Sequence, residues 1–347
     1  LPIYINSTSR FQGTGNIGFT PTTQGRNVFL GSEASTSQPG MKVNQASINV
    51  LSAGFDSVTF GETGFSGTIT VGETTAYNRL NLVNNGGGKV RLTGKLTVQG
   101  TSTDGVGVFI DGSGATTVLS ADIVTPGTAI LISDAVEVNA PTIILDTTNG
   151  GTAPDGADVT ITGGTTGIYS TSGVNNNLTV TAGDKGAVSL GTLRGFGTGG
   201  GLGSLVGNLT VTGASISLPM ASRLGGSPIL GNADTDLITV DGALTSANAA
   251  GIVMIGTDIS LGADITAGAA LSLGGAVALT NSVVLSGDGI TVIAGIAADN
   301  NNLTLDGRSG AVGTKGLVSV SGAITDAANL NVDPKSTRLN SSHTDIS

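Results

Sequence analysis

The sequence predicts an all-β protein, and its most specific architecture is a parallel β-helix, a solenoid of stacked coils. The composition supports this prediction, because glycine supplies 57 of the 347 residues, about one in six where roughly 7% is usual. A glycine in a helix interior costs about 1 kcal/mol, which argues against a helical protein. The composition also argues against a disordered chain, because 38% of the residues are hydrophobic and only 11% are charged.

The second observation is the alternation of apolar residues with Ser or Thr, as in Leu178–Thr181. This period of two is typical of a strand with one buried face. Most such runs end at Gly, Asn or Asp-Gly, as at Asp111-Gly112, and these residues favour turns. The stretch with the most helical pattern, Ala247–Ile255, is predicted to be a buried strand because its flanks resemble the other strands.

The third observation is a set of internal repeats. Leu119–Val138 recurs as Leu261–Leu279 at an offset of 142 that falls to 141, and Leu96–Gly100 recurs as Ile238–Gly242 at the same 142. Further matches join Asn175–Val188 with Asn300–Val312, Ile48–Gly61 with Leu178–Gly191, and Arg79–Val83 with Asn208–Thr212. Because the matches keep one order along the chain, we interpret them as a degenerate super-repeat of about 120–140 residues.

These repeats predict the organisation of the chain. We expect residues 1–40 to be irregular or to form the first coils, 41–333 to form the β-helix, and 334–347 to be a disordered tail. Within the β-helix we expect a partial copy over 41–85 and further copies over 86–224 and 225–333. The segment Lys335–Ser347 resembles a translated sequencing adapter and not native protein, and it contains the single histidine, His343.

Tandem β-sandwiches are the alternative architecture. They would repeat at about 100 residues and anchor a core on Trp or a Tyr corner, but the chain has no Trp and its three Tyr do not recur at a repeat offset. A propeller would show blades of about 40–50 residues. Coils of about 20 residues would instead give about fifteen coils, with neighbouring strands about 4.8 Å apart.

The composition also excludes several kinds of functional site and partner. Without Cys the chain has no disulfide, thiolate metal site or cysteine nucleophile, and without a His before His343 it has no histidine base in its body. The net charge of −10 argues against nucleic acid as a partner. No apolar run approaches the roughly 20 residues that span a membrane.

The stretches NLTVTGASISL at Asn208–Leu218 and DISLGADI at Asp258–Ile265 resemble the repeats of filamentous-haemagglutinin-like and autotransporter-type adhesins. The resemblance covers roughly residues 41–333. It implies a right-handed β-helical stalk or passenger segment of a large secreted protein at the Gram-negative cell surface. It also implies adhesion to host or cell-surface glycans or proteins, or to neighbouring cells in a biofilm. We expect a non-enzymatic fragment of such a protein, starting at Leu1 after a removed leader or inside a longer chain.

A β-helical polysaccharide-binding or polysaccharide-degrading protein is the alternative function. Glycoside hydrolysis needs a pair of carboxylates, and Asp234, Asp236 and Asp241, with Arg223, form the one candidate cluster. These aspartates stand beside Gly, Asn or Thr, however, and are interpreted as turn residues.

Calcium is the one cofactor considered, as a structural ion. Asp155, Asp158 and Asp288 are the candidate ligands, because GADVTITGG and GDGITVIAG share part of a calcium-binding β-roll pattern. The tandem nonapeptide itself is missing, so our prediction assigns no catalytic, cofactor or metal site.

Overall fold

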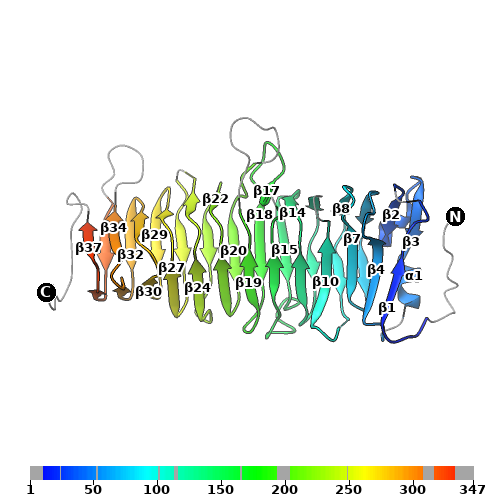
Figure 1. The fold of residues 1–347 in the computed structure, drawn as a ribbon, viewed down its shortest axis with the longest axis horizontal. Coiled ribbons are helices and arrows are strands. Elements are labelled where there is room, and N and C mark those ends of the chain that lie inside the picture. Colours follow the sequence, from blue (N-terminus) through cyan, green and yellow to red (C-terminus); the bar gives the residue numbers. More distant parts are fainter. Residues whose placement is uncertain are drawn as a thin grey trace. The chain divides into compact units, whose positions relative to one another are not determined.

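The computed structural model describes residues 11–332, apart from 24, 52–53, 101, 113–115, 165, 194–203, 248 and 308–315. The tail over 334–347, with His343, lies outside the described residues. The chain divides into two compact units. The N-terminal unit comprises Leu1–Thr171 with Asn176–Ala187, and the C-terminal unit comprises Ser172–Asn175 with Val188–Ser347. Within each unit the strands of successive coils lie side by side (Figure 1).

The N-terminal unit contains three parallel sheets, and each coil after the first contributes one strand to each sheet. The first coil contributes two strands, β2 and β3, to the second sheet and none to the third. The first sheet holds β1 (Asn16–Phe19), β4 (Ser57–Glu62), β7 (Leu80–Asn84), β10 (Val106–Asp111), β13 (Ala129–Ile132) and β16 (Val159–Ile161). The second holds β3 (Gly40–Val43), β2 (Asn27–Leu30), β5 (Ile69–Val71), β8 (Lys89–Leu92), β11 (Thr116–Leu119), β14 (Ala135–Val138) and β17 (Ile168–Ser170). The third holds β6 (Thr74–Ala76), β9 (Leu96–Val98), β12 (Ile123–Val124), β15 (Thr142–Asp146) and β18 (Asn177–Thr181).

The C-terminal unit is built on the same plan. Its first sheet holds β19 (Ala187–Leu190), β21 (Ser215–Leu218), β24 (Leu237–Val240), β27 (Asp258–Leu261), β30 (Ala276–Leu279), β33 (Ile296–Ala297) and β36 (Ile324–Thr325). The second holds β22 (Ser222–Leu224), β25 (Leu244–Ser246), β28 (Ile265–Thr266), β31 (Val283–Ser286), β34 (Asn302–Asp306) and β37 (Asn329–Val332). The third holds β20 (Leu209–Thr212), β23 (Pro228–Leu230), β26 (Ile252–Met254), β29 (Ala270–Leu273), β32 (Gly289–Val292) and β35 (Val318–Val320).

This architecture confirms the predicted parallel β-helix. The first sheets contribute six strands in one unit and seven in the other, so the described residues form thirteen coils, close to the expected fifteen. The number is lower because several coils exceed 20 residues. Leu80 pairs with Val108, 28 positions on, and Ile130 pairs with Val159, 29 positions on. In the second case the extra length is the loop between β15 and β16.

The core of each unit consists of aliphatic side chains stacked in register. In the N-terminal unit Leu82, Ile110 and Ile132 occupy one column, each fully buried. In the C-terminal unit Val240 and Leu261 stack in the same way. Each coil therefore buries its apolar residues against the coils before and after it, which is the energetic pattern of a solenoid.

The sequence repeat is reproduced strand by strand. β11 to β14 and β27 to β30 have the same bounds once the offset of 142, falling to 141, is applied. Asp122 and Asp264, also 142 apart, accept the backbone N–H of Ile144 and Val284 respectively, both at 2.8 Å. Both copies thus use an aspartate at the corresponding turn to bind a strand of the next coil.

One match in the repeat is not a match in structure. Ile48–Val50 aligns with a strand in the sequence, but α1 (Gln45–Val50) is a helix. Asn44 begins it, because its side chain accepts the N–H of Ser47 at 2.9 Å. The helix follows a short 3-10 helix, η1 (Gly31–Ser35), and β3, and it packs against β6.

Glycine is required at the equivalent positions Gly100 and Gly242. A Cβ at Gly100 would overlap the backbone of Tyr77 and Asn78, and one at Gly242 would overlap that of Met220 and Ala221. In both cases the clashing residues precede the glycine by about one coil. Close approach of neighbouring coils therefore demands glycine here.

Candidate functional site

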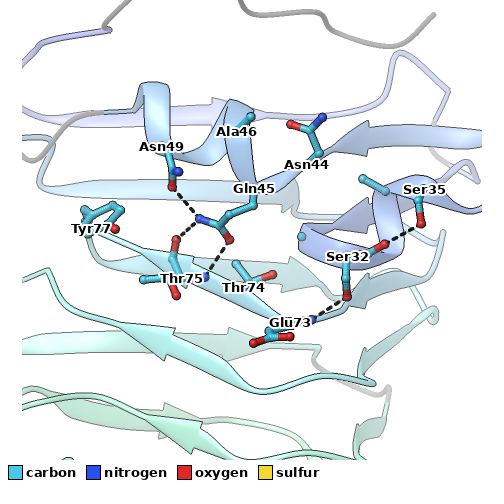
Figure 2. A pocket seen from close by; sticks show the side chains of 12 residues that line it. Ser32, Ser35, Asn44, Gln45, Ala46, Asn49, Glu73, Thr74, Thr75 and Tyr77 are labelled. Atoms are coloured by element: carbon cyan, nitrogen blue, oxygen red, sulfur yellow. Dashed lines mark hydrogen bonds between the residues drawn. The ribbon is translucent and has the colours of Figure 1, made fainter. Parts of the chain in front are cut away.

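The N-terminal unit has a groove of about 800 Å³ between α1 with η1 on one side and the segment Glu73–Tyr77 on the other (Figure 2). Its lining residues are Gly31, Ser32, Ala34, Ser35, Asn44, Gln45, Ala46, Asn49, Glu73, Thr74, Thr75 and Tyr77. We call this the amide groove, because three amide side chains line it.

Gln45 fixes the centre of the amide groove. Its Oε1 accepts the backbone N–H of Thr75 at 2.9 Å, and its Nε2 donates to the Thr75 carbonyl at 2.7 Å and to Asn49 Oδ1 at 2.6 Å (Figure 2). β6, which contains Thr75, is the outermost strand of its sheet among the described residues. The Gln45 side chain thus hydrogen-bonds to β6 as a further strand would.

Hydrogen bonds also hold the wall formed by η1 against the segment Glu73–Tyr77. Ser32 Oγ accepts the backbone N–H of Glu73 at 2.9 Å, and Ser35 Oγ donates to the Ser32 carbonyl at 2.9 Å (Figure 2). This approach requires glycine at Gly31, whose φ is +63° and whose Cβ would overlap Thr74. The groove therefore has two walls that are joined by hydrogen bonds at its floor.

The groove is nearly uncharged, and most of its lining side chains are amides or hydroxyls. Glu73 is its one carboxylate, and none of its described lining residues is Lys or Arg. Tyr77 lies at the opposite end of the groove from Ser32 and Ser35 (Figure 2) and is 40% exposed, whereas Tyr169 is 8% exposed. A ligand in the groove would therefore contact amides, hydroxyls and one aromatic ring.

A second distinctive group is the buried carboxyl of Asp134, which is 1% exposed at the turn between β13 and β14. Its Oδ1 accepts the N–H of Gly112 and its Oδ2 accepts the hydroxyl of Thr117, both at 2.6 Å. Burial, together with the nearby Asp111 carboxylate, raises the pKa of Asp134, although both hydrogen bonds oppose this. Because both of its oxygens are engaged within the protein, we interpret Asp134 as a structural brace between two coils.

The structure separates the residues considered for glycoside hydrolysis. Asp234 and Asp236 precede β24 and Asp241 follows it, so the four-residue strand, about 13 Å long, stands between them. Arg223 lies on β22 of another sheet. All four side chains are exposed, and β24 keeps Asp241 apart from Asp234 and Asp236.

The calcium candidates of the N-terminal unit have partners within the protein. Asp155 forms an ion pair with Lys185 at 2.5 Å, and Asp158 Oδ1 accepts the N–H of Ala187 at 2.8 Å. In the C-terminal unit, Asp288 follows β31 and has one buried oxygen without a hydrogen-bond partner among the described atoms. Across the described residues, no three acidic or histidine side chains are grouped so that they could hold a metal.

Sequence reasoning missed the amide groove and Asp134. Part of the groove falls in 1–40, where the absence of alternation pointed only to irregular structure. The concentration of Ser, Gln and Asn between residues 32 and 49 was the available signal. Asp134 was indistinguishable from the many turn aspartates.

Comparison of the chain with family models, with curated proteins and with solved structures finds no match. The adhesin resemblance thus rests on the repeat pattern alone. Over the part of the chain that the structure describes, no helix is long and apolar enough to cross a membrane.

Proposed function

We propose that the chain is a non-enzymatic structural stalk, a passenger segment of a secreted surface protein that holds other parts of that protein away from the cell. The stacking of aliphatic columns in register within each unit carries this proposal. A solenoid of this kind gains stability coil by coil. Its length can therefore change without loss of the fold, as a spacer requires.

Deletion of one whole coil tests the proposal. Asp258 pairs with Ala276, 18 positions on, so removal of 258–275 lets β30 occupy the place of β27 against β24. We expect a folded variant, because each apolar column loses one layer and keeps its register. Circular dichroism and thermal unfolding should show a single transition close to that of the parent chain.

Deletion of half a coil is the matched control. Removal of 258–266 takes out β27 and β28 and puts the following strands on the wrong sheets, so the C-terminal unit should unfold. A whole-coil variant as disordered as this control would contradict the stalk proposal.

Spin labels measure the spacer directly. Ser217 and Ala297 stand in one row of outward positions, four coils apart through Thr239, Ser260 and Ala278. Because the chain has no Cys, cysteines at these two positions can be labelled specifically. We expect a narrow distance distribution near 19 Å that shortens by about 4.8 Å in the whole-coil variant. A broad distribution would show that the unit is too flexible to act as a spacer.

A further inference from the structure

We propose that the amide groove binds a neutral oligosaccharide. Its volume of about 800 Å³ falls within the roughly 300–1,000 Å³ of ligand sites. It lies wholly within the N-terminal unit, between α1, η1 and β6. This inference is independent of the stalk proposal, because a spacer needs no ligand.

The lining favours a ligand rich in hydroxyl groups. The Oδ1 atoms of Asn44 and Asn49 accept from Ser47 and Gln45, so their amide N–H groups are the donors that face a ligand. The Ser32 hydroxyl accepts from Glu73 and can still donate, and the Ser35 hydroxyl donates to Ser32 and can still accept. The Glu73 carboxylate accepts hydrogen bonds and is exposed. Sugar hydroxyls are themselves donors and acceptors, so they can satisfy such a mixed set.

The charge of the groove argues against other ligand classes. An anionic ligand, such as a nucleic acid or a phosphorylated peptide, needs Lys or Arg, and no described lining residue is either. A polycationic ligand would need several carboxylates, whereas Glu73 is alone. A neutral, polar ligand remains.

Tyr77 supplies the apolar contact that a saccharide requires. The C–H face of a sugar ring is apolar, and a Tyr ring combines an apolar face with a polar tip. Tyr77 is 40% exposed in a chain whose residues are only 3% aromatic. It lies at one end of the groove, beyond Thr75 (Figure 2).

The groove is organised before any ligand arrives. The three hydrogen bonds of Gln45 hold α1 against β6 and orient the Asn49 amide. Sites held by such supporting contacts lose less freedom on binding. The groove therefore suits a weakly interacting ligand such as a sugar chain.

Calorimetric titration of the full chain tests this proposal. The probes are the hexasaccharides of cellulose, mannan, xylan and amylose, with an oligogalacturonate as the anionic comparison. We expect at least one neutral probe to bind and the oligogalacturonate to bind more weakly. We expect Tyr77→Ala to weaken binding about tenfold or more and Tyr77→Phe to retain most of the affinity.

Two further variants guard against a folding artefact. Ala46→Arg places a long side chain in the groove from an exposed helix position and should abolish binding without lowering the melting temperature. Ile293→Ala, at a 61% exposed apolar residue of the C-terminal unit, should bind like the parent. Failure of all neutral probes, stronger binding of the oligogalacturonate, or binding unaffected by Tyr77→Ala and Ala46→Arg would overturn the proposal.

The whole-coil deletion keeps the two proposals separable. That variant retains every residue of the amide groove, so its affinity for the neutral probe should equal that of the parent. Lost affinity in this variant would contradict the placement of the site.

Discussion

The two units share one plan but differ in what they bury. Twelve polar side chains are buried in the N-terminal unit and four in the C-terminal unit, among the described residues. The four are Ser222, Thr235, Ser246 and Ser286, whereas the twelve include the carboxyl of Asp134 and the amides of Asn78 and Asn84. A buried polar group must find a partner at a defined position. The N-terminal coils thus differ from one another in their buried polar contacts, whereas the C-terminal coils are more alike.

Coil length differs only over part of the C-terminal unit. There the register advances by 21 residues from Ile238 to Ile259 and by 18 from Ile259 to Val277, but by 28 from Ile296 to Ile324. In the N-terminal unit it advances by 22 from Val58 to Leu80 and by 28 to Val108. Among the described residues both helices, η1 and α1, belong to the N-terminal unit, and the amide groove lies beside them.

A charge placed in the buried apolar column should destabilise both units strongly, and this is the largest effect that we expect. Val180 on β18 and Val240 on β24 are both fully buried. Val180→Asp and Val240→Asp should each lower the free energy of unfolding by more than about 4 kcal/mol, because each buries an unpaired charge. Urea unfolding followed by circular dichroism measures this loss.

Thr181→Asp and Thr239→Asp are the matched controls. These threonines are partly exposed on the outward side of the same strands, so the change should stay within about 0.5 kcal/mol. Equal losses at Val180 and Thr181 would show that the inward assignment of β18 is wrong.

Removal of the Asp134 carboxyl should give a smaller loss that belongs to the N-terminal unit alone. Asp134→Ala leaves the Gly112 N–H and the Thr117 hydroxyl without partners, at about 1–3 kcal/mol each. Asp134→Asn keeps an oxygen for Gly112 and an amide for Thr117, so it should be at least as stable as the parent at neutral pH. Chemical denaturation of the three proteins at pH 7 checks this order.

The same carboxyl predicts a dependence on pH. Because the folded pKa of Asp134 is raised, the folded protein holds this proton more tightly than the unfolded chain does. Its stabilising contribution is fully present below the unfolded value of about 3.8 and is lost as the pH rises through the folded pKa. The stability of the parent relative to Asp134→Asn should therefore fall as the pH rises from 3 to 7. A constant difference would contradict the burial of this group.

The smallest effect should come from Gly100→Ala and Gly242→Ala, one in each unit. Each adds a methyl group where the backbone of the preceding coil lies, and such overpacking costs about 1–3 kcal/mol. Gly18→Ala is the control, because no atom lies within 4 Å of its added Cβ. Thermal unfolding should rank both corner variants below the control, and equal melting temperatures would contradict the close approach of the coils.

Much of this fold could be predicted from the sequence. The alternation in Leu178–Thr181 locates β18 and its inward Val180, and the offset of 142 anticipates the bounds of β27 to β30. These features succeed because the strand period and the turn residues are local properties of the chain. The carboxylates Asp234 and Asp241 were a cluster only in sequence distance, and an extended strand separates them.

The remaining features depend on contacts between coils. Asp134 is buried because stacking brings Gly112 and Thr117 to it from 22 and 17 residues away. Ile48–Val50 reads as a strand by its alternation, yet Asn44 caps a helix there and Gln45 finds Thr75, 30 residues away, as its partner. No local sequence pattern predicts such contacts between residues of different coils.

The pairing of Gln45 with Thr75 also has a consequence for how the gene can grow. A side chain occupies the hydrogen-bonding groups of β6 that another strand would use, so this sheet cannot be extended by a coil on the α1 side. Duplication of a coil keeps the strand register only where one strand can take the place of another, as β30 can for β27. Gain or loss of a whole C-terminal coil should therefore yield variants that still fold, and natural variants of this protein should differ in length there and not next to α1.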